Sequence, residues 1–279
     1  MKILILGGRG FLGSEIGNHL EKHEVYTFDR HKGGKMHFKG DMNSFEDLKK
    51  ASRGMDTVIN LVGLTPLFEP KNTTYYDVHV NGVENMLNAC KKNNVSKIIH
   101  ISALGADKNS DIEYLRTKGI GEEKVKNSKI DPVIFKPSVI YDENNELIEM
   151  LYKSAPLMLF PKIKTRMQLI HRSNVAELVS KAFAGEIGEG SLEIAGPKKL
   201  PLHKIAEKIY RKRGFPCVKF PYFFFHPVLK AVSSLRLFGI GKGQAKSINL
   251  DNTTNKNDAK RYIKLTDFES WIKKANLKT

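Results

Sequence analysis

The sequence has little cysteine and no hydrophobic run long enough to cross a membrane. Its two cysteines, Cys90 and Cys217, are too few for a disulfide framework, so we expect a reducing compartment, the cytoplasm. A transmembrane helix needs about 20 consecutive apolar residues, and no such run occurs. The apolar run over residues 1–6 is too short for a signal peptide and lacks a cleavage pattern. The sequence therefore predicts a globular cytoplasmic protein.

Motifs for metal and nucleic-acid binding are also missing. The nine histidines form no HExxH motif and no paired Cys/His spacing, so no metal site is predicted. Nucleic-acid binding has only positive charge in its favour, because no recognition motif occurs. We therefore expect neither a metal nor a nucleic-acid partner.

Acidic residues are scarce in the C-terminal quarter. The formal net charge is +16, yet residues 1–200 hold 29 Lys and Arg against 25 Asp and Glu. Residues 201–279 hold 17 basic against 5 acidic residues, which leaves +12. A field of one sign attracts anions such as phosphorylated ligands, an anionic membrane or an acidic partner. A generally lysine-rich set of proteins in the source organism explains the charge equally well, so both explanations stay open.

The first 137 residues alternate between short apolar runs and segments of helical periodicity. The apolar runs predict strands, and the periodic segments between them predict helices, at 11–23, 44–51, 75–93 and 113–126. The predicted strands cover residues 2–6, 24–28, 38–39, 57–63, 97–102 and 132–136. Strands that alternate with helices predict an α/β fold with one doubly wound parallel sheet, a Rossmann fold.

The pattern changes after residue 137 and predicts a smaller C-terminal α/β lobe. Helices are expected at 147–152, 174–184 and 202–213, and a strand at 191–195, while 156–161 is expected to be irregular. We assign residues 1–185 to a dinucleotide-binding domain that includes interleaved lobe segments at about 142–168. Residues 186–279 then form a substrate or interaction lobe.

A glycine-rich turn follows the first predicted strand. Gly7 permits a tight turn, and Gly10 lets a diphosphate approach the backbone closely. Gly13 lets the helix pack closely on the strand. The helix that follows offers its N–H groups and positive end to phosphates. Asp29 ends the next strand, 22 residues after Gly7, where a carboxylate binds a ribose diol and repels a 2′-phosphate. The sequence therefore predicts dinucleotide binding and favours NAD.

NADP stays an alternative because basic residues surround Asp29. Four side chains are able to bind a 2′-phosphate there, namely those of Arg9, Arg30, His31 and Lys32. Asp41 follows the third predicted strand and is a candidate contact for the adenine edge.

Three residues form a candidate catalytic set. Tyr114 and Lys118 are four residues apart and so share one face of a helix. Ser102 ends the preceding strand, at the sheet edge where ligands of such folds bind. An ammonium and a positive nicotinamide ring stabilise a phenolate, so Tyr114 is predicted to exchange a proton near neutrality. Ser102 would hydrogen-bond the substrate oxygen, and Lys118 would also hold the nicotinamide ribose.

Taken together, these segments resemble the short-chain dehydrogenase/reductase superfamily. The matching residues are GGRGFLG at 7–13, Asp29, Gly40-Asp41, INLVG at 59–63, Asn81, HISALGA at 100–106, YLRTK at 114–118 and FKPSVIY at 135–141. Segments 170–183 and 190–209 are similar to the extended, epimerase-type branch. The details are most similar to the atypical subgroup that contains the NAD(P)H-binding accessory subunit of respiratory complex I.

The resemblance implies a set of cofactor contacts. Besides the three glycines, Asp29, Asp41 and Lys118, it places Phe11, Leu12, Arg30, Met42, Val62, Gly63 and Pro137 at the cofactor. It implies Ser102, Tyr114 and Lys118 as the catalytic set if a reaction occurs. Three departures argue against sugar-nucleotide chemistry: the short 102–114 connection, Asn174 in place of an acidic residue, and Asp142 in place of a glycine.

The segment 220–243 is basic and aromatic, with an aromatic cluster at 222–225. A helix from Pro227 is predicted to place Val228, Leu229, Val232, Leu235 and Phe238 on one face, with Lys230 and Arg236 near its border. Such a segment packs against the substrate lobe or lies at a bilayer interface. We favour packing; either arrangement suits an apolar, quinone-like small molecule.

Three functions stay open. The first is an NAD(P)-dependent oxidoreductase that uses Ser102, Tyr114 and Lys118. The second is a non-catalytic NAD(P)H-binding accessory protein, peripheral to a membrane complex on the inner face of the membrane. The third is a nucleotide-sugar epimerase or dehydratase. The sequence makes no prediction about oligomeric state.

Overall fold

The structure is a computed structural model that describes residues 1–67, 72–235 and 242–277. Its contacts divide the chain into two units that are interleaved along the sequence. The first unit comprises Met1–Leu64, Pro70–Pro137 and Val175–Glu193, and the second comprises Thr65–Glu69, Ser138–Asn174 and Ile194–Thr279. The first unit thus extends past the boundary expected at residue 185, because the strand that begins at Gly190 joins its sheet.

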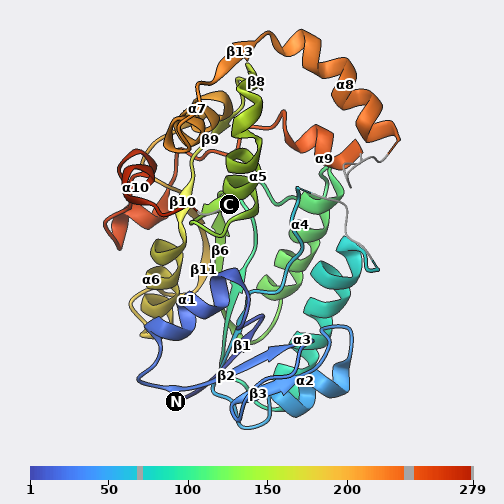
Figure 1. The fold of residues 1–279 in the computed structure, drawn as a ribbon. Helices are drawn as coiled ribbons and strands as arrows, with labels where there is room; N and C mark the ends of the chain where they lie inside the picture. The colour runs from blue at the N-terminus through green and yellow to red at the C-terminus, as the bar shows by residue number, and fades with distance from the viewer. Residues whose placement is uncertain (68–71, 236–241, 278–279) are drawn as a thin grey trace. The chain divides into compact units, whose positions relative to one another are not determined.

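The first unit is built on a seven-stranded sheet of order β11-β6-β5-β4-β1-β2-β3 (Figure 1). The strands are β1 (Lys2–Leu6), β2 (Glu24–Asp29), β3 (His37–Lys39), β4 (Thr57–Asn60), β5 (Lys97–Ile101), β6 (Asp131–Pro137) and β11 (Gly190–Ile194). β1 pairs in parallel with both β2 and β4, so that Leu6 lies opposite Phe28 and Asn60. The strand order reverses beside β1, which is the point where doubly wound sheets bind ligands. The predicted fold class is confirmed.

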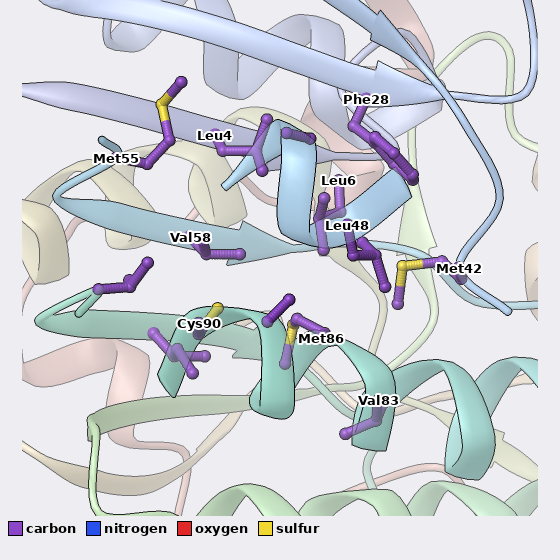
Figure 2. Close-up of a cluster of buried hydrophobic side chains, with 14 of the residues drawn as sticks. Leu4, Leu6, Phe28, Met42, Leu48, Met55, Val58, Val83, Met86 and Cys90 are labelled. Atoms are coloured by element: carbon purple, nitrogen blue, oxygen red, sulfur yellow. The ribbon is translucent and has the colours of Figure 1, made fainter. Parts of the chain in front are cut away.

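The central strands are apolar because helices cover the sheet. All four residues of β4 and four of the five in β1 are buried. Figure 2 shows Leu4, Leu6 and Val58 from the strands facing Leu48 from α2 (Phe45–Ala51) and Met86 from α3 (Gly82–Lys92). Burial of one such side chain contributes about 1.5–3 kcal/mol. This core holds β1 and β4 rigidly, and their carboxyl ends carry the site described below.

Four further helical segments complete the first unit. They are α1 (Phe11–His19), the π-helix η1 (Asp77–Asn81), α4 (Glu113–Lys126) and α6 (Arg172–Phe183), which belongs to this unit from Val175 onward. The predicted strand over 57–63 ends at Asn60, because the Asn60 side chain accepts a hydrogen bond from the Val62 amide. The predicted helix over 75–93 is divided into η1 and α3.

The second unit has short strand pairs around a helical core. Buried side chains of α5 (Glu146–Ser154), α7 (Leu202–Lys212) and α10 (Phe268–Lys274) pack together with Tyr141. The pairs are β7 (Ile140–Tyr141) with β10 (Ile170–His171), β9 (Arg166–Met167) with β12 (Leu200–Pro201), and β8 (Leu159–Pro161) with β13 (Val218–Phe220). η2 (Ala155–Leu157) and β8 therefore occupy the segment that we expected to be irregular. The remaining elements are α8 (Tyr222–Ser234), α9 (Lys242–Ser247) and η4 (Asp258–Arg261).

The tail helix differs from its prediction. α8 begins at Tyr222 rather than Pro227 and accommodates Pro227 in its interior. The residues predicted to share one face are separated: Leu229 is buried, whereas Val228 and Leu235 are 57% and 69% exposed. Phe238 and Arg236 lie outside the described residues. Among the helices that the structure describes, none has the length and apolar character needed to span a bilayer.

Candidate functional site

The glycine turn brings the start of α1 against the end of β1. Gly7 has a φ of +77°, in the left-handed region that favours glycine, and its carbonyl accepts a 3.0 Å hydrogen bond from the Gly10 amide. A Cβ on Gly13 would lie 2.4 Å from the Gly7 carbonyl oxygen and 2.6 Å from the Gly8 backbone. Only a glycine at position 13 therefore permits this approach of helix to turn.

The N-terminus of α1 has the features of an anion-binding helix end. Its N-cap residue is Gly10, and no side-chain hydrogen bond caps the helix. The first turn carries Phe11, which is partly exposed, and Leu12, which is buried. The helix dipole places partial positive charge at this end, next to the Gly7 turn.

Asp29 ends β2 in a half-buried position. Its Oδ1 accepts a 2.8 Å hydrogen bond from the His31 amide and lies 3.8 Å from His37 Nε2. A carboxylate has about four acceptor positions, so these contacts leave capacity for a sugar diol. Arg9 donates to the Lys32 carbonyl across the same loop, while Arg30 is exposed.

Asp41 and Met42 lie beyond β3 and contribute mainly to local structure. Asp41 Oδ1 accepts from the Asn43 amide at 2.9 Å. The Met42 side chain lies in the hydrophobic core (Figure 2), and its carbonyl accepts from Asn85 Nδ2 at 3.2 Å. Met42 can therefore meet a ligand only through its backbone.

Lys118 reaches the carboxyl ends of β4 and β5 from α4. Its side chain is buried, and Nζ donates to the Ile101 carbonyl at 3.2 Å. A Cβ on Gly63 would lie 2.9 Å from Lys118 Nζ, so the glycine makes room for the ammonium. Burial lowers the pKa of Lys118 to about 8. Val62 lies between this position and the Gly7 turn, since its Cγ2 is 3.4 Å from an ideal Cβ on Gly7.

His79 is a site residue that sequence reasoning missed. The Leu64 amide donates to its Nε2 at 3.1 Å, so the ring proton is on Nδ1, which faces Thr117 Oγ1 at 3.0 Å. Its ring also meets Tyr114 edge-on, at 5.6 Å between centroids. Local pattern gave no signal, because a histidine between two valines on a helix is typical of a core position. The π-helix around it is a form that often occurs at functional sites.

A second buried imidazole, His100, lies on β5. Its Nδ1 accepts from Asn60 Nδ2 at 3.1 Å. Burial, followed by the Lys118 charge, lowers the pKa of His79 to about 2 and that of His100 to about 3. The Lys118 charge thus acts on two buried imidazoles that are neutral.

We expect the free energy of unfolding to fall as the pH drops below 6.5. Below that value the unfolded chain protonates both histidines while the folded chain does not, so stability is lost as pH falls. Each of His79 and His100 contributes about 1.4 kcal/mol per pH unit. Urea unfolding between pH 7 and 5 measures how steeply the free energy of unfolding changes with pH. His79→Gln should reduce it and His19→Gln, at an exposed site, should leave it unchanged; equal slopes in all three proteins would contradict this assignment.

Tyr114 lies one helical turn before Lys118 on α4. Its ring packs edge-on against Tyr75, at 5.7 Å between centroids, as well as against His79. From the sequence we expect the Lys118 ammonium to lower the pKa of Tyr114. In the structure burial raises the pKa of Tyr114, and Tyr75 adds to the effect. The protein by itself therefore keeps the phenol protonated.

Ser102 is directed into a buried charge cluster. Its Oγ donates to Glu122 Oε2 at 2.9 Å, and Glu122 Oε1 lies 2.6 Å from Lys126 Nζ and 3.4 Å from Lys136 Nζ. A hydroxyl has one proton, so in this arrangement Ser102 cannot also donate to a substrate oxygen. Pro137 ends β6 nearby, and its carbonyl accepts from the Leu104 amide at 2.8 Å. In the part of the chain that is described, no group of His, Cys, Asp or Glu could hold a metal ion.

The parallel sheet, its strand order and the glycine turn after β1 together define a Rossmann fold. Residues 4–119 match the 3-beta hydroxysteroid dehydrogenase/isomerase family. The chain is 25% identical over 178 residues to the mitochondrial NADH-ubiquinone oxidoreductase 40 kDa subunit of Neurospora crassa, which covers 62% of this chain and 47% of that protein. It is also 25% identical over 226 residues to the mitochondrial NADH dehydrogenase [ubiquinone] 1 alpha subcomplex subunit 9 of Rattus norvegicus, covering 74% of this chain and 59% of that protein.

A solved structure agrees in fold. The Thermus thermophilus UDP-glucose 4-epimerase in complex with NAD has a TM-score of 0.65 at 18% identity, over 79% of this chain and 86% of that one. These matches confirm the resemblance that the sequence motifs indicate. The chain spans roughly half to three fifths of the length of the two curated relatives.

Proposed function

We propose that the protein binds NAD in its first unit, at the carboxyl ends of β1, β2 and β4. The observation that carries the proposal is the contact of Gly13 with the Gly7 carbonyl, which only a glycine allows. Such a turn presents backbone amides and a positive helix end to a diphosphate. The NAD complex of the similar Thermus thermophilus enzyme supports the same ligand.

Each predicted contact residue has chemistry that suits part of the dinucleotide. The backbone of the Gly7 turn, together with that of Phe11 and Leu12, would bind the diphosphate. The Asp29 carboxylate would bind the adenosine ribose. Lys118 Nζ is a donor for the nicotinamide ribose. The remaining predicted contacts line the adenine and nicotinamide ends: Arg30, Asp41, Met42, Val62, Gly63 and Pro137.

We propose NAD over NADP on the basis of charge. The Asp29 carboxylate repels a 2′-phosphate and accepts from a free diol. The Arg9 side chain would offset part of that repulsion, but its guanidinium donates to the Lys32 carbonyl.

The role that the geometry favours is nucleotide binding without turnover. Ser102 donates its hydrogen bond to Glu122 instead of to a substrate, and burial raises the pKa of Tyr114. The first feature opposes binding of a substrate oxygen by Ser102, and the second opposes proton transfer by Tyr114 near neutral pH. One relative is named as a subunit of NADH-ubiquinone oxidoreductase and the other as a subunit of NADH dehydrogenase. Both names support a role as an accessory subunit, which we propose to be peripheral to a membrane complex.

An NAD-dependent oxidoreductase is the second candidate, favoured by Tyr114 and Lys118 on one helix face. NADH would supply a hydride to an apolar, quinone-like substrate. The Tyr114 hydroxyl would give its proton to the reduced oxygen, and the Lys118 ammonium would stabilise the phenolate that remains. Nucleotide-sugar epimerisation is a third candidate, with support from the name of the Thermus thermophilus enzyme.

Mass spectrometry of ligand released from the purified protein, followed by turnover assays, tests these roles. We expect bound NAD and no oxidation of NADH in the presence of a short-chain quinone. If turnover occurs, Tyr114→Phe should abolish it and leave NAD affinity within about twofold, because the phenol is assigned to proton transfer alone. Thermal stabilisation by UDP-sugars, with no net change in the cofactor, would favour the epimerase instead.

A further inference from the structure

Helix α8 of the second unit carries an exposed apolar stripe. None of the residues that the structure describes covers this stripe. Phe224, Val228, Ala231 and Leu235 are spaced at i, i+4, i+7 and i+11, so they lie on one helix face. Phe224, Val228 and Leu235 are 65%, 57% and 69% exposed. The opposite face carries Leu229 and Ser233, which are buried. One face of α8 is therefore buried within the protein, while the apolar face with Phe224 and Val228 is exposed to solvent.

A second exposed apolar group lies at the strand pair that leads into α8. Leu157, Met158, Leu159 and Val218 are all exposed, by 42% to 71%. Val218 is in register with Leu159, and its amide donates to the Met158 carbonyl at 2.7 Å. Figure 1 shows α8 following directly from β13. Groups of exposed apolar side chains mark an interaction site more often than scattered apolar residues do.

The segments that carry this surface contain no acidic residue. Residues 208–250 hold nine Lys and Arg and no Asp or Glu, and residues 150–176 hold five Lys and Arg and none. Lys162 and Lys164, which follow β8, and Lys230 on α8 are exposed. Carboxylates from outside these segments pair with some of the basic side chains, as Glu207 does with Lys219 of β13 at 2.7 Å. The segments still carry a net excess of positive charge, to which the exposed Lys162, Lys164 and Lys230 belong.

We propose that α8 and the β8–β13 pair together bind the surface of a bilayer that carries anionic headgroups. The stripe and the exposed strand residues enter the interface, and the lysines meet phosphates, each contributing about 1 kcal/mol before screening. A second copy of the chain would bring the same positive charge to the contact and be repelled. Nucleic acid would match the charge but not the apolar stripe. A bilayer surface matches both.

Sedimentation with lipid vesicles tests this proposal on the full chain. Vesicles of phosphatidylcholine are compared with vesicles that contain about one third phosphatidylglycerol. We expect at least tenfold stronger binding to the anionic vesicles and release at high salt, because salt screens the charges. Phe224→Asp with Val228→Asp should weaken binding at least tenfold. Met36→Asp, at a 42% exposed site of the first unit, is the matched control and should bind like the original chain.

Each alternative gives its own result. Equal vesicle binding by the double variant and the original chain would overturn the proposal, as would failure of the original chain to bind anionic vesicles. Self-association that the double variant loses, without vesicle binding, would assign the surface to a second copy. NAD titration of the double variant should match the original chain, so loss of NAD binding and loss of vesicle binding are separate outcomes. Circular dichroism checks that each variant is folded.

Discussion

We expect Gly13→Ala to lower NAD affinity by at least tenfold and to lower the melting temperature. The new methyl group would lie 2.4 Å from the Gly7 carbonyl oxygen and 2.6 Å from the Gly8 backbone, so α1 or the turn must move. Forced overpacking of this kind costs about 1–3 kcal/mol in stability. It also displaces the amides that would hold a diphosphate. Calorimetric titration with NAD and thermal unfolding measure the two effects.

The matched control lies on the same helix. Gly17 is in α1, and a Cβ built there meets nothing within 4 Å. Gly17→Ala should therefore preserve NAD affinity and raise stability by up to about 1 kcal/mol, because alanine favours a helix over glycine. If both variants bound NAD like the original chain, the turn would not be the diphosphate site.

Glu122→Ala should be the most destabilising change in the charge cluster beneath Ser102. Glu122 is only 2% exposed, and its carboxylate meets Ser102 Oγ, Lys126 Nζ and Lys136 Nζ. Removal of the Glu122 carboxylate leaves the largely buried Lys136 ammonium without its ion-pair partner. Loss of one partner of a buried ion pair lowers the free energy of unfolding by about 3–5 kcal/mol. Urea unfolding measures the change.

Glu123 provides the comparison from the next position on α4. Its carboxylate pairs with Lys108 Nζ at 2.7 Å, and both side chains are about half exposed. Exposed pairs contribute about 0–1 kcal/mol, so Glu123→Ala should have little effect. Equal destabilisation by the two alanine variants would show that the Glu122 cluster is not a buried structural element.

Local pattern predicted the elements whose boundaries depend on nearby residues. β1 and α4 have the bounds expected from sequence, because an apolar run ends at a glycine turn and a periodic helix needs no distant partner. β8 was missed because it exists only through pairing with β13, about 60 residues further along the chain. The end of β4 was misplaced because a side-chain contact of Asn60, rather than composition, ends the strand.

The sequence likewise predicted some features of the candidate site and missed others. Chain direction and the order of elements bring Gly7, Asp29 and Lys118 to the same sheet edge, and the spacing of motifs carries that information. The orientation of a hydroxyl does not follow from spacing: Ser102 points at Glu122, a residue 20 positions away on the other side of a loop. His79 likewise takes its place through contacts with Leu64 and Thr117 that only the folded chain brings together.

Calorimetric titration of the purified chain with NAD and, separately, with NADP tests the central claim most directly. We predict saturable binding of one NAD per chain, at least tenfold weaker binding of NADP, and a reversal of that preference in Asp29→Ala. Failure of both dinucleotides to bind a chain freed of its endogenous ligand would contradict the account.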